Sequence, residues 1–267
     1  MGAAYEIRTV CPGERETDVL VFGSGAKPLL LLPGLSVSSV LTNAAAVAHA
    51  YQAFSDPFTV YLPDRRKRLP AGYSVWDMAA DTAAVMDALA IAAADVIGVS
   101  QGGMIAMCLA LTAPERVAKL ALCSTAAFVA PQADAVLGEW MRLASTGDAA
   151  ALTASFYEKL FSPAVLRAFG LTESAAGLPP LTPEEQARFT ALAGAAVGFD
   201  IRSRLGEIRC PALVLGAEND AVLTGEAVKE TADLLGCERY LYPAPYGHGV
   251  YDEAADFKAR LLRFLEN

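Results

Sequence analysis

The chain has 267 residues, 54% of them hydrophobic, which is enough apolar material for a sizeable core. Its formal net charge is −9, from 21 basic and 30 acidic residues, and this balance argues against nucleic acid, whose binding depends on neutralising phosphates. The longest apolar stretches fall short of the roughly 18 residues that a membrane span requires, so we expect no membrane partner either.

The N-terminal segment MGAAYEIRTVCPGERE does not place an apolar stretch after a basic one. We therefore expect no secretory signal and a cytoplasmic location. The cysteines are odd in number, widely scattered and without a Cys-x-x-Cys pair, which indicates neither a disulfide framework nor a zinc knuckle. The two histidines, His49 and His248, are not paired at helical spacing, so we expect no metal site and no cofactor.

The first elements along the chain are predicted to be short strands. They cover residues 5–10, 18–23 and 27–34, and Gly23-Ser24-Gly25 is typical of a hairpin connection between the last two. From residue 28 onward, apolar runs alternate with helical patterns. Strands are expected at residues 57–64, 95–99, 117–124, 210–220 and 238–244, and helices at 73–90, 101–114, 224–236 and 251–267.

The helix over residues 73–90 has a capping-box pattern, because Ser74 is followed three residues later by Asp77. The later strands do not alternate apolar and polar residues, which is typical of strands buried on both faces. The fold class predicted is therefore α/β, with a mostly parallel central sheet and helices on both faces.

Residues 128–199 interrupt this alternation. Helical patterns cover residues 133–145, 150–162 and 163–170, and Thr182-Pro183-Glu184-Glu185 is typical of a further helix start. We interpret this region as a helical cap inserted after the sixth strand, with the core formed by residues 1–127 and 200–267. Its aromatic side chains include Trp140 and Phe161 as candidate substrate contacts, although such residues also pack helix on helix. An apolar cap is also a candidate homodimer surface.

The stretch DVIGVSQGGMIAM, residues 95–107, carries the main chemical signal. Ser100 lies where a strand becomes a helix, in the pattern Gly-x-Ser-x-Gly formed by Gly98 and Gly102. A sharp turn there would raise the serine above the sheet, and only very small side chains fit two residues before and after it. The N-terminus of the following helix would favour a developing negative charge.

A serine nucleophile needs a base, which is nearly always a histidine oriented by a carboxylate. His248 lies in the glycine-flanked loop PYGHGVYDE between the last strand and the last helix, whereas His49 lies in a helical pattern. The strand ending in LVLGAEND offers Glu218 and Asp220, and we prefer Asp220 because the turn should leave it facing the histidine loop. An oxyanion hole needs two N–H donors, and we predict Gln101, directly after the serine, and Leu35, after Gly34.

The cluster Arg65-Arg66-Lys67-Arg68 is interpreted as a solvated loop. The alternative is that it guides an anionic substrate.

The sequence resembles the α/β-hydrolase superfamily, in particular its capped serine esterases and lactonases. The segments LLLLPGL, GVSQGG, PALVLGAEND and YGHGVY carry the resemblance over nearly the whole chain. It implies Ser100 as nucleophile, Asp220 as orienting acid and His248 as base, in that chain order. Two positions depart from the family: PDRRKRLPAGYS lacks the glycines of an Asp-x-Arg-Gly-x-Gly-x-Ser loop, and Pro33 stands where many relatives have histidine.

The leading functional hypothesis is a serine hydrolase that cleaves carboxylic esters or lactones of small, largely apolar substrates through an acyl-enzyme. The same three residues also serve C–C bond hydrolysis, perhydrolysis and lyase reactions on this fold. A third hypothesis is a binding protein that keeps the fold and uses the pocket for a ligand. An intact set of serine, acid and histidine argues against that last reading.

Overall fold

The computed structural model describes residues 4–267. The first three residues, part of the segment in which no targeting signal is expected, lie outside this range. The strands are β1 (Tyr5–Val10), β2 (Thr17–Phe22), β3 (Lys27–Leu32), β4 (Phe58–Pro63), β5 (Ala94–Val99), β6 (Val117–Cys123), β7 (Ala212–Ala217) and β8 (Glu238–Tyr242). The helices are α1 (Ala44–Ala50), α2 (Val75–Ala88), α3 (Gln101–Thr112), α4 (Pro131–Ser145), α5 (Ala149–Leu160), α6 (Pro163–Phe169), α7 (Leu171–Ala175), α8 (Pro183–Gly194), α9 (Gly225–Leu235), α10 (Val250–Glu253) and α11 (Phe257–Glu266).

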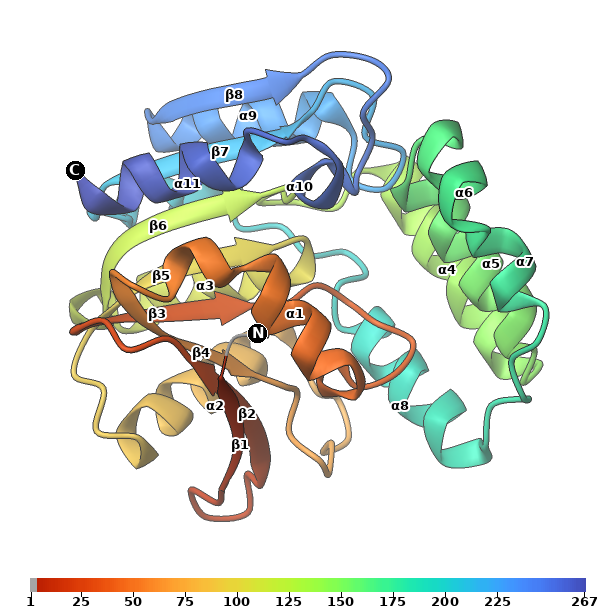
Figure 1. Ribbon diagram of the computed structural model, residues 1–267, viewed down its shortest axis with the longest axis horizontal. Helices are drawn as coiled ribbons and strands as arrows, with labels where there is room; N and C mark the ends of the chain where they lie inside the picture. The colour runs from red at the N-terminus through yellow and green to blue at the C-terminus, as the bar shows by residue number, and fades with distance from the viewer. Residues whose placement is uncertain (1–3) are drawn as a thin grey trace.

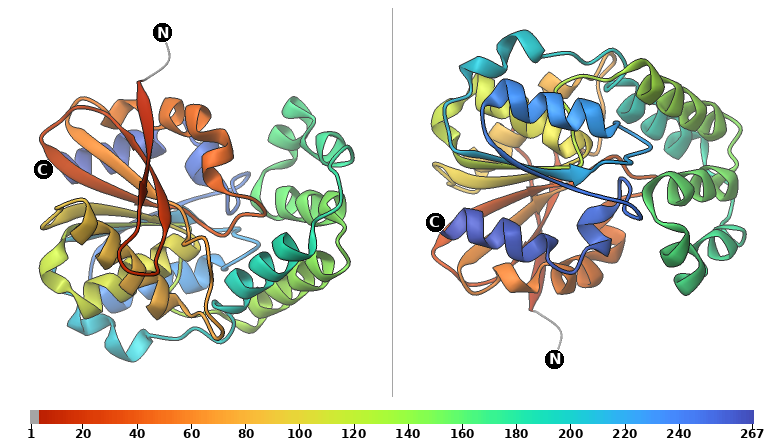
Figure 2. Two further views of the ribbon diagram at one scale, coloured as in Figure 1. Left: turned by 90° about the horizontal axis from the view of Figure 1, so that it is seen from below. Right: turned by 90° about the horizontal axis from the view of Figure 1, so that it is seen from above.

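One eight-stranded sheet forms the centre of the protein, in the order β1-β2-β4-β3-β5-β6-β7-β8. The strands from β4 to β8 in this order are parallel, while β1 and β2 pair antiparallel at one edge. Helices α2, α3 and α9 cover one face of the sheet, and α1, α10 and α11 cover the other (Figure 2). The α/β class predicted from the sequence is confirmed.

Both faces of the central strands are buried, as the unbroken apolar runs predict. In β3, Leu30 faces the cluster under α2 and α3, whereas Leu31 faces the cluster under α1 and α11. In β5, Val96 and Ile97 divide in the same way, and all six residues of the strand are buried. This two-sided burial places β5 in the interior, so only its carboxyl end can present a side chain to a ligand.

The predicted hairpin between β2 and β3 is wrong, because β4 lies between these strands. The connecting segment crosses the entry to β4, and the Ser24 N–H donates to Ser55 O at 2.9 Å. A Cβ at Gly23 or Gly25 would overlap the backbone of Pro57 or Phe58. These glycines therefore allow two backbone segments to approach closely, rather than forming a two-strand turn.

The helical cap after β6 consists of α4 to α8 and lies beyond the carboxyl ends of the parallel strands (Figure 1). The chain leaves and re-enters the core at one place, where Phe128 and Asp200 form an isolated antiparallel bridge. The Val129 N–H donates to Phe199 O at 2.8 Å, and the Ile201 N–H donates to Ala127 O at 2.9 Å. The cap is therefore held at its base by backbone pairing.

Helix starts follow the predicted capping boxes, with Ser74 and Asp77 opening α2 and Thr182 and Glu185 opening α8. The single helix predicted for residues 251–267 is wrong, since α10 and α11 are separate. Ala254 is extended between them, with φ −80° and ψ 120°. Within residues 4–267, no helix combines the length and the apolarity needed to cross a bilayer.

Candidate active site

Ser100 occupies a strained turn between β5 and α3. Its φ is +52° and its ψ is −123°, a conformation that a residue other than glycine adopts only at a cost of about 1–3 kcal/mol. The turn is held by neighbouring backbone, because the Ser100 N–H donates to Cys123 O at 2.9 Å. Thr125 Oγ1 donates to Ser100 O at 2.7 Å. The strain is therefore fixed by contacts on the side of β6.

Three glycines around Ser100 allow this turn. A Cβ at Gly98 would lie 2.6 Å from Gly102 O and from the Cα of Gly103. A Cβ at Gly102 would overlap the carbonyl of Leu32 in β3. A Cβ at Gly103 would lie 2.6 Å from the Cβ of Thr125. The crowding predicted for Gly98 and Gly102 is present, and Gly103 is a third close approach that the pattern Gly-x-Ser-x-Gly does not include.

The structure brings Ser100, His248 and Asp220 together from three separate strand ends. His248 Nε2 lies 3.0 Å from Ser100 Oγ, and His248 Nδ1 lies 2.7 Å from Asp220 Oδ2. Asp220 follows β7, and His248 lies in the loop after β8. His248 and Asp220 are 2% and 4% exposed, so this hydrogen-bonded series is shielded from water except at the serine, which is partly exposed.

The carboxylate of Asp220 is well satisfied despite its burial. Burial alone would raise the pKa of its carboxyl, but His248 and the N–H groups of Leu223 and Val222 lower that pKa below its usual value. Its stabilising contribution is therefore fully present above the pKa of about 3.9 of an unfolded aspartate, and it is lost as pH falls through the lower folded value. The carboxylate stays charged at neutral pH.

The two predicted oxyanion donors lie next to this series. Gly34 approaches the serine so closely that a Cβ on it would lie 3.2 Å from Ser100 Cβ, which places the loop of Leu35 beside the turn. Across residues 4–267, the backbone N–H groups of Leu35 and Gln101 donate to no protein acceptor. These two N–H groups could therefore donate hydrogen bonds to an acceptor that lies beside the Ser100 hydroxyl.

Cap residues reach the histidine loop directly. The Gly249 N–H donates to Leu160 O at 2.7 Å, and a Cβ on Gly249 would lie 2.9 Å from the Phe161 ring. Phe161, predicted to contact substrate, therefore packs against Gly249, the residue that follows His248. On the other side of the cap, Gln101 Nε2 donates to Leu192 O at 2.6 Å.

Trp140, the other predicted substrate contact, lies in the packed interior of the cap. Its indole is 2% exposed, stacks on Phe156 with ring centroids 3.9 Å apart, and donates to Ser155 Oγ at 3.2 Å. Phe156 in turn contacts Phe189 edge-on at 5.7 Å. These contacts explain the burial of Trp140, and its role as a substrate contact stays a prediction.

The predicted solvated loop at residues 65–68 is wrong for its first member. Arg65 is 9% exposed, whereas Lys67 and Arg68 are exposed, and Arg66 lies 3.5 Å from Asp81. Arg65 Nη2 donates to Pro33 O at 2.8 Å and to Gln101 Oε1 at 3.2 Å. Sequence patterns did not indicate that Arg65 would be buried beside the serine site. Its place just after the carboxyl end of β4 is a signal for a residue near a ligand site, because ligands of α/β sheets bind at the carboxyl ends of the strands.

Two cavities adjoin the loop of Gly34, Leu35 and Ser36. One of about 390 Å³ is mainly apolar and extends under α1 to Tyr51 and Tyr251. The other, of about 310 Å³, is more polar. It is lined by both predicted oxyanion residues, by Arg65, and by Arg188, Phe189 and Leu192 of α8.

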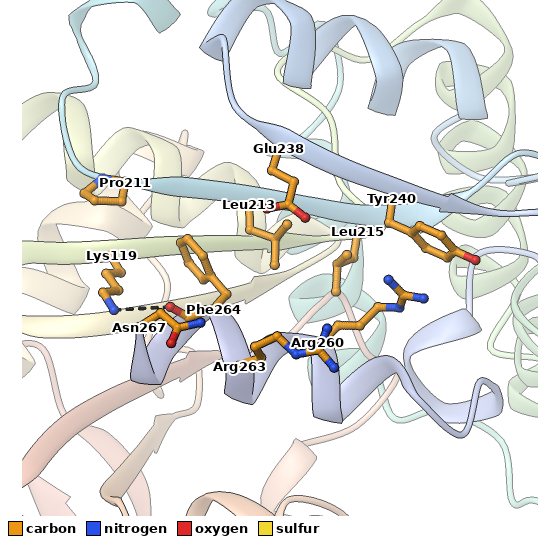
Figure 3. A pocket seen from close by; sticks show the side chains of 10 residues that line it. All are labelled: Lys119, Pro211, Leu213, Leu215, Glu238, Tyr240, Arg260, Arg263, Phe264 and Asn267. Atoms are coloured by element: carbon orange, nitrogen blue, oxygen red, sulfur yellow. Dashed lines mark hydrogen bonds between the residues drawn. The ribbon is translucent and has the colours of Figure 1, made fainter.

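A separate cavity of about 320 Å³ lies between α11 and strands β6 to β8 (Figure 3). Its lining includes Pro211 and Glu238, at the amino ends of β7 and β8, so it is at the opposite end of the sheet from Ser100. Lys119 Nζ donates there to the carbonyls of Phe264 and Leu265, at 3.2 and 2.8 Å, and so satisfies the C-terminal end of α11. This cavity is not part of the serine site.

No cluster of three or more His, Cys, Asp or Glu side chains suited to a metal occurs among residues 4–267.

The mostly parallel sheet has helices on both faces, and Ser100 lies on a strained turn between a strand and a helix. A histidine and a carboxylate are hydrogen-bonded in series with this serine. This combination is typical of hydrolases. The chain belongs to the alpha/beta hydrolase fold family, whose model matches residues 27–255. It is 33% identical over 208 residues to a Variovorax paradoxus protein named "Putative carbamate hydrolase RutD", covering 74% of this chain and 75% of that protein.

Solved structures are similar over nearly the full length. A hydrolase from Pseudomonas aeruginosa matches with a TM-score of 0.80 and 25% identity, covering 98% of this chain and 99% of that one. The enol-lactonase from Burkholderia xenovorans matches with a TM-score of 0.82 and 23% identity, covering 97% and 100%. The second likeness concerns the fold alone.

Proposed function

We propose that the protein is a serine hydrolase that cleaves carboxylic esters or lactones of small substrates through an acyl-enzyme. The observation that carries this proposal is the series Asp220–His248–Ser100, joined at 2.7 and 3.0 Å beside two unpaired backbone N–H groups. Each part matches a requirement of acyl transfer: a nucleophile, a base, an orienting carboxylate and donors for an oxyanion.

In the first half-reaction, Ser100 Oγ attacks the substrate carbonyl while His248 Nε2 accepts the hydroxyl proton. The carbonyl oxygen becomes negative and accepts hydrogen bonds from the N–H groups of Leu35 and Gln101. The imidazolium is stabilised by Asp220 and gives its proton to the leaving alkoxide as its bond to the carbonyl carbon breaks, so that an ester to Ser100 remains. The alcohol departs from an ester substrate, whereas it stays attached to the acyl group of a lactone. Water then attacks the ester to Ser100 with His248 again as base, and His248 returns the proton to Ser100 Oγ as the acid is released.

The substrate is proposed to bind between the cap and the loop of residues 34–36. The adjoining cavities of about 310 and 390 Å³ suit small molecules. Phe161, which packs on Gly249, is the better placed of the two predicted aromatic contacts. The polar lining of the smaller cavity favours a substrate that is apolar on one side of the reacting carbonyl and hydrogen-bonding on the other.

The proposal is tested with a fluorophosphonate probe and a substrate panel. We expect one adduct, located on Ser100 by peptide mass spectrometry, and turnover of short p-nitrophenyl esters or of lactones. The panel also contains carbamates, because a relative carries that name, and β-diketones for C–C bond cleavage. Turnover of carbamates or β-diketones without ester or lactone turnover would replace the substrate class, and absence of an adduct on Ser100 would favour a binding protein.

The pH profile tests the role of His248. An imidazolium cannot accept a proton, so kcat/KM should decline toward acid pH if a histidine is the base. Asp220 stays ionised from neutral to mildly acidic pH because its pKa lies below the usual value of an aspartate. The decline should therefore be first-order in protons, and a flat or second-order profile would contradict the assignment.

Replacing Asp220 with asparagine should lower kcat by about 10³- to 10⁴-fold with little change in KM. The N–H groups of Val222 and Leu223 hold Oδ1, so the amide would turn its NH2 group toward His248 Nδ1 and donate where the carboxylate accepts. The tautomer that leaves Nε2 free is then no longer favoured. Steady-state kinetics measure this loss, and Glu218→Gln is the matched control because Glu218 follows the same strand, β7, and is exposed. Equal losses in both variants would reassign the carboxylate.

A further inference from the structure

Arg65 connects the two segments that supply the oxyanion donors. One hydrogen at Nη2 is directed to Pro33 O, in the peptide segment that leads to Leu35, and another to the side chain of Gln101. The distances are 2.8 and 3.2 Å. A single guanidinium nitrogen thus holds the loop after β3 against the first residue of α3.

The Arg65 guanidinium has no salt-bridge partner among the described residues. The carboxylate of Asp64 acts on its charge without a direct contact, and Nε is enclosed without an acceptor. The neighbouring Asp64 carboxylate accepts instead from the Arg65 backbone N–H at 2.7 Å and from Ser39 Oγ at 2.5 Å. Burial lowers the pKa of Arg65, and the neighbouring Tyr73 and Asp64 offset this lowering only in part.

An enclosed cation without a counter-charge costs free energy, and a negative charge formed nearby would offset that cost. The cavity lined by Arg65 also contains Gly34, Leu35 and Gln101. In the proposed reaction, the negative charge develops on an oxygen that accepts hydrogen bonds from the N–H groups of Leu35 and Gln101. The structure therefore places a positive charge that has no salt-bridge partner in the cavity where this oxygen would form, and Asp64 and Glu185 line the same cavity.

The hydrogen-bonded pair of Arg65 and Gln101 also links the serine turn to the cap. Gln101 uses its other amide atom, Nε2, to donate to Leu192 O in α8 at 2.6 Å. Arg188 of α8 donates through Nη2 to Arg65 O at 3.1 Å and through Nη1 to Arg66 O at 2.8 Å. Helix α8, Arg65 and the serine turn are therefore one connected hydrogen-bonded network.

We propose that Arg65 is a positioning residue of the oxyanion hole. By donating to Pro33 O and Gln101 Oε1 together, it keeps the N–H groups of Leu35 and Gln101 directed at one point, and its positive charge favours the negative oxygen formed there. The inference rests on the proposed function, because the oxyanion exists only if Ser100 attacks a carbonyl. Arg65 touches neither the substrate nor the reacting atoms in this proposal.

The test compares Arg65→Met, Arg65→Lys, Gln101→Met and the double variant Arg65→Met/Gln101→Met. Arg68→Met is the matched control, since Arg68 is in the same loop but exposed. Each variant is assayed with the best ester or lactone of the panel. Inhibition is measured with a trifluoromethyl ketone, which forms an oxyanion on the serine, and with the carboxylic acid product, which does not.

Arg65→Met should lower kcat by about 10- to 100-fold, less than the loss of a whole oxyanion donor, while KM stays within about threefold. The trifluoromethyl ketone should weaken in parallel with kcat/KM, and the acid product should bind unchanged. Arg65→Lys, which keeps the charge but not the planar fork, should fall in between. Because Arg65 acts partly through the Gln101 side chain, the double variant should lose less than the product of the single losses.

Unchanged kcat in Arg65→Met, or equal weakening of the ketone and the acid product, would overturn the inference. Thermal melting identifies a variant that fails to fold, and Arg65→Lys then carries the comparison. The fluorophosphonate reaction distinguishes failure of the inference about Arg65 from failure of the proposed function. If Ser100 of the unaltered protein is labelled but the Arg65 variants are labelled at the same rate, the inference alone fails, whereas absence of labelling defeats the proposed function and the inference together.

Discussion

Replacing Ser100 with alanine is expected to lower turnover of p-nitrophenyl esters by about five to six orders of magnitude, because the bond-forming oxygen is removed. The fold should be retained, since alanine has the same backbone restrictions as serine at φ +52°. The backbone bonds to Cys123 and from Thr125 do not involve the hydroxyl. Turnover and circular dichroism, measured on the same preparation, check both parts of this expectation.

Ser124 provides a matched control for this experiment. It also has a positive φ, at +44°, it is buried, and it follows β6 at the same edge of the sheet. Its Oγ has no hydrogen-bond partner among the described residues. Ser124→Ala should therefore keep ester turnover near the original rate. Loss of activity in Ser124→Ala and not in Ser100→Ala would refute the assignment of the nucleophile.

The largest effect on stability is expected at Gly102. A Cβ there would overlap the carbonyl of Leu32 and lie 2.6 Å from Pro33 O. Both obstacles are backbone atoms in and just after a central strand, so no side chain can move aside. Gly102→Ala should therefore lower the free energy of unfolding by about 3 kcal/mol or more and displace the loop of Leu35. Urea unfolding followed by circular dichroism measures the first effect, and ester turnover measures the second.

Gly138→Ala is the comparison for this variant. Gly138 lies on the exposed side of α4, and a Cβ there would meet nothing within 4 Å. Alanine is the better helix former, so this variant should gain about 0.5–1 kcal/mol of stability. If both substitutions left stability unchanged, the packing of the serine turn against β3 would not be as tight as described.

The parts of the fold that could be predicted depend on short-range patterns. Alternating strand and helix patterns predicted the parallel sheet, and capping residues such as Ser74 and Thr182 marked helix starts correctly. The Gly-x-Ser-x-Gly turn indicates Ser100, the turn after a strand indicates Asp220, and the glycine-flanked loop after the last strand indicates His248. The predicted residues at these positions are the ones that the structure brings together.

The errors at the expected hairpin and at Arg65 concern contacts between residues far apart in the sequence. The segment from Gly23 to Gly25 has a turn composition, but the insertion of β4 between β2 and β3 depends on strand order, which no local pattern contains. The burial of Arg65 follows from its contacts with Pro33 and Gln101, 32 and 36 residues away. Packing against Phe156 decides where Trp140 lies, and its role as a substrate contact stays a prediction.

The way in which the cap is attached has a consequence for how this protein could acquire a new specificity. Its two ends meet at the Phe128–Asp200 bridge, and two of its contacts with the serine and histidine segments are made through main-chain carbonyls, those of Leu160 and Leu192. Main-chain groups are present whatever the side chains are. An exchanged insert of different composition could thus satisfy the same anchor points, so the reactive centre could be inherited intact while the recognition surface above it is replaced.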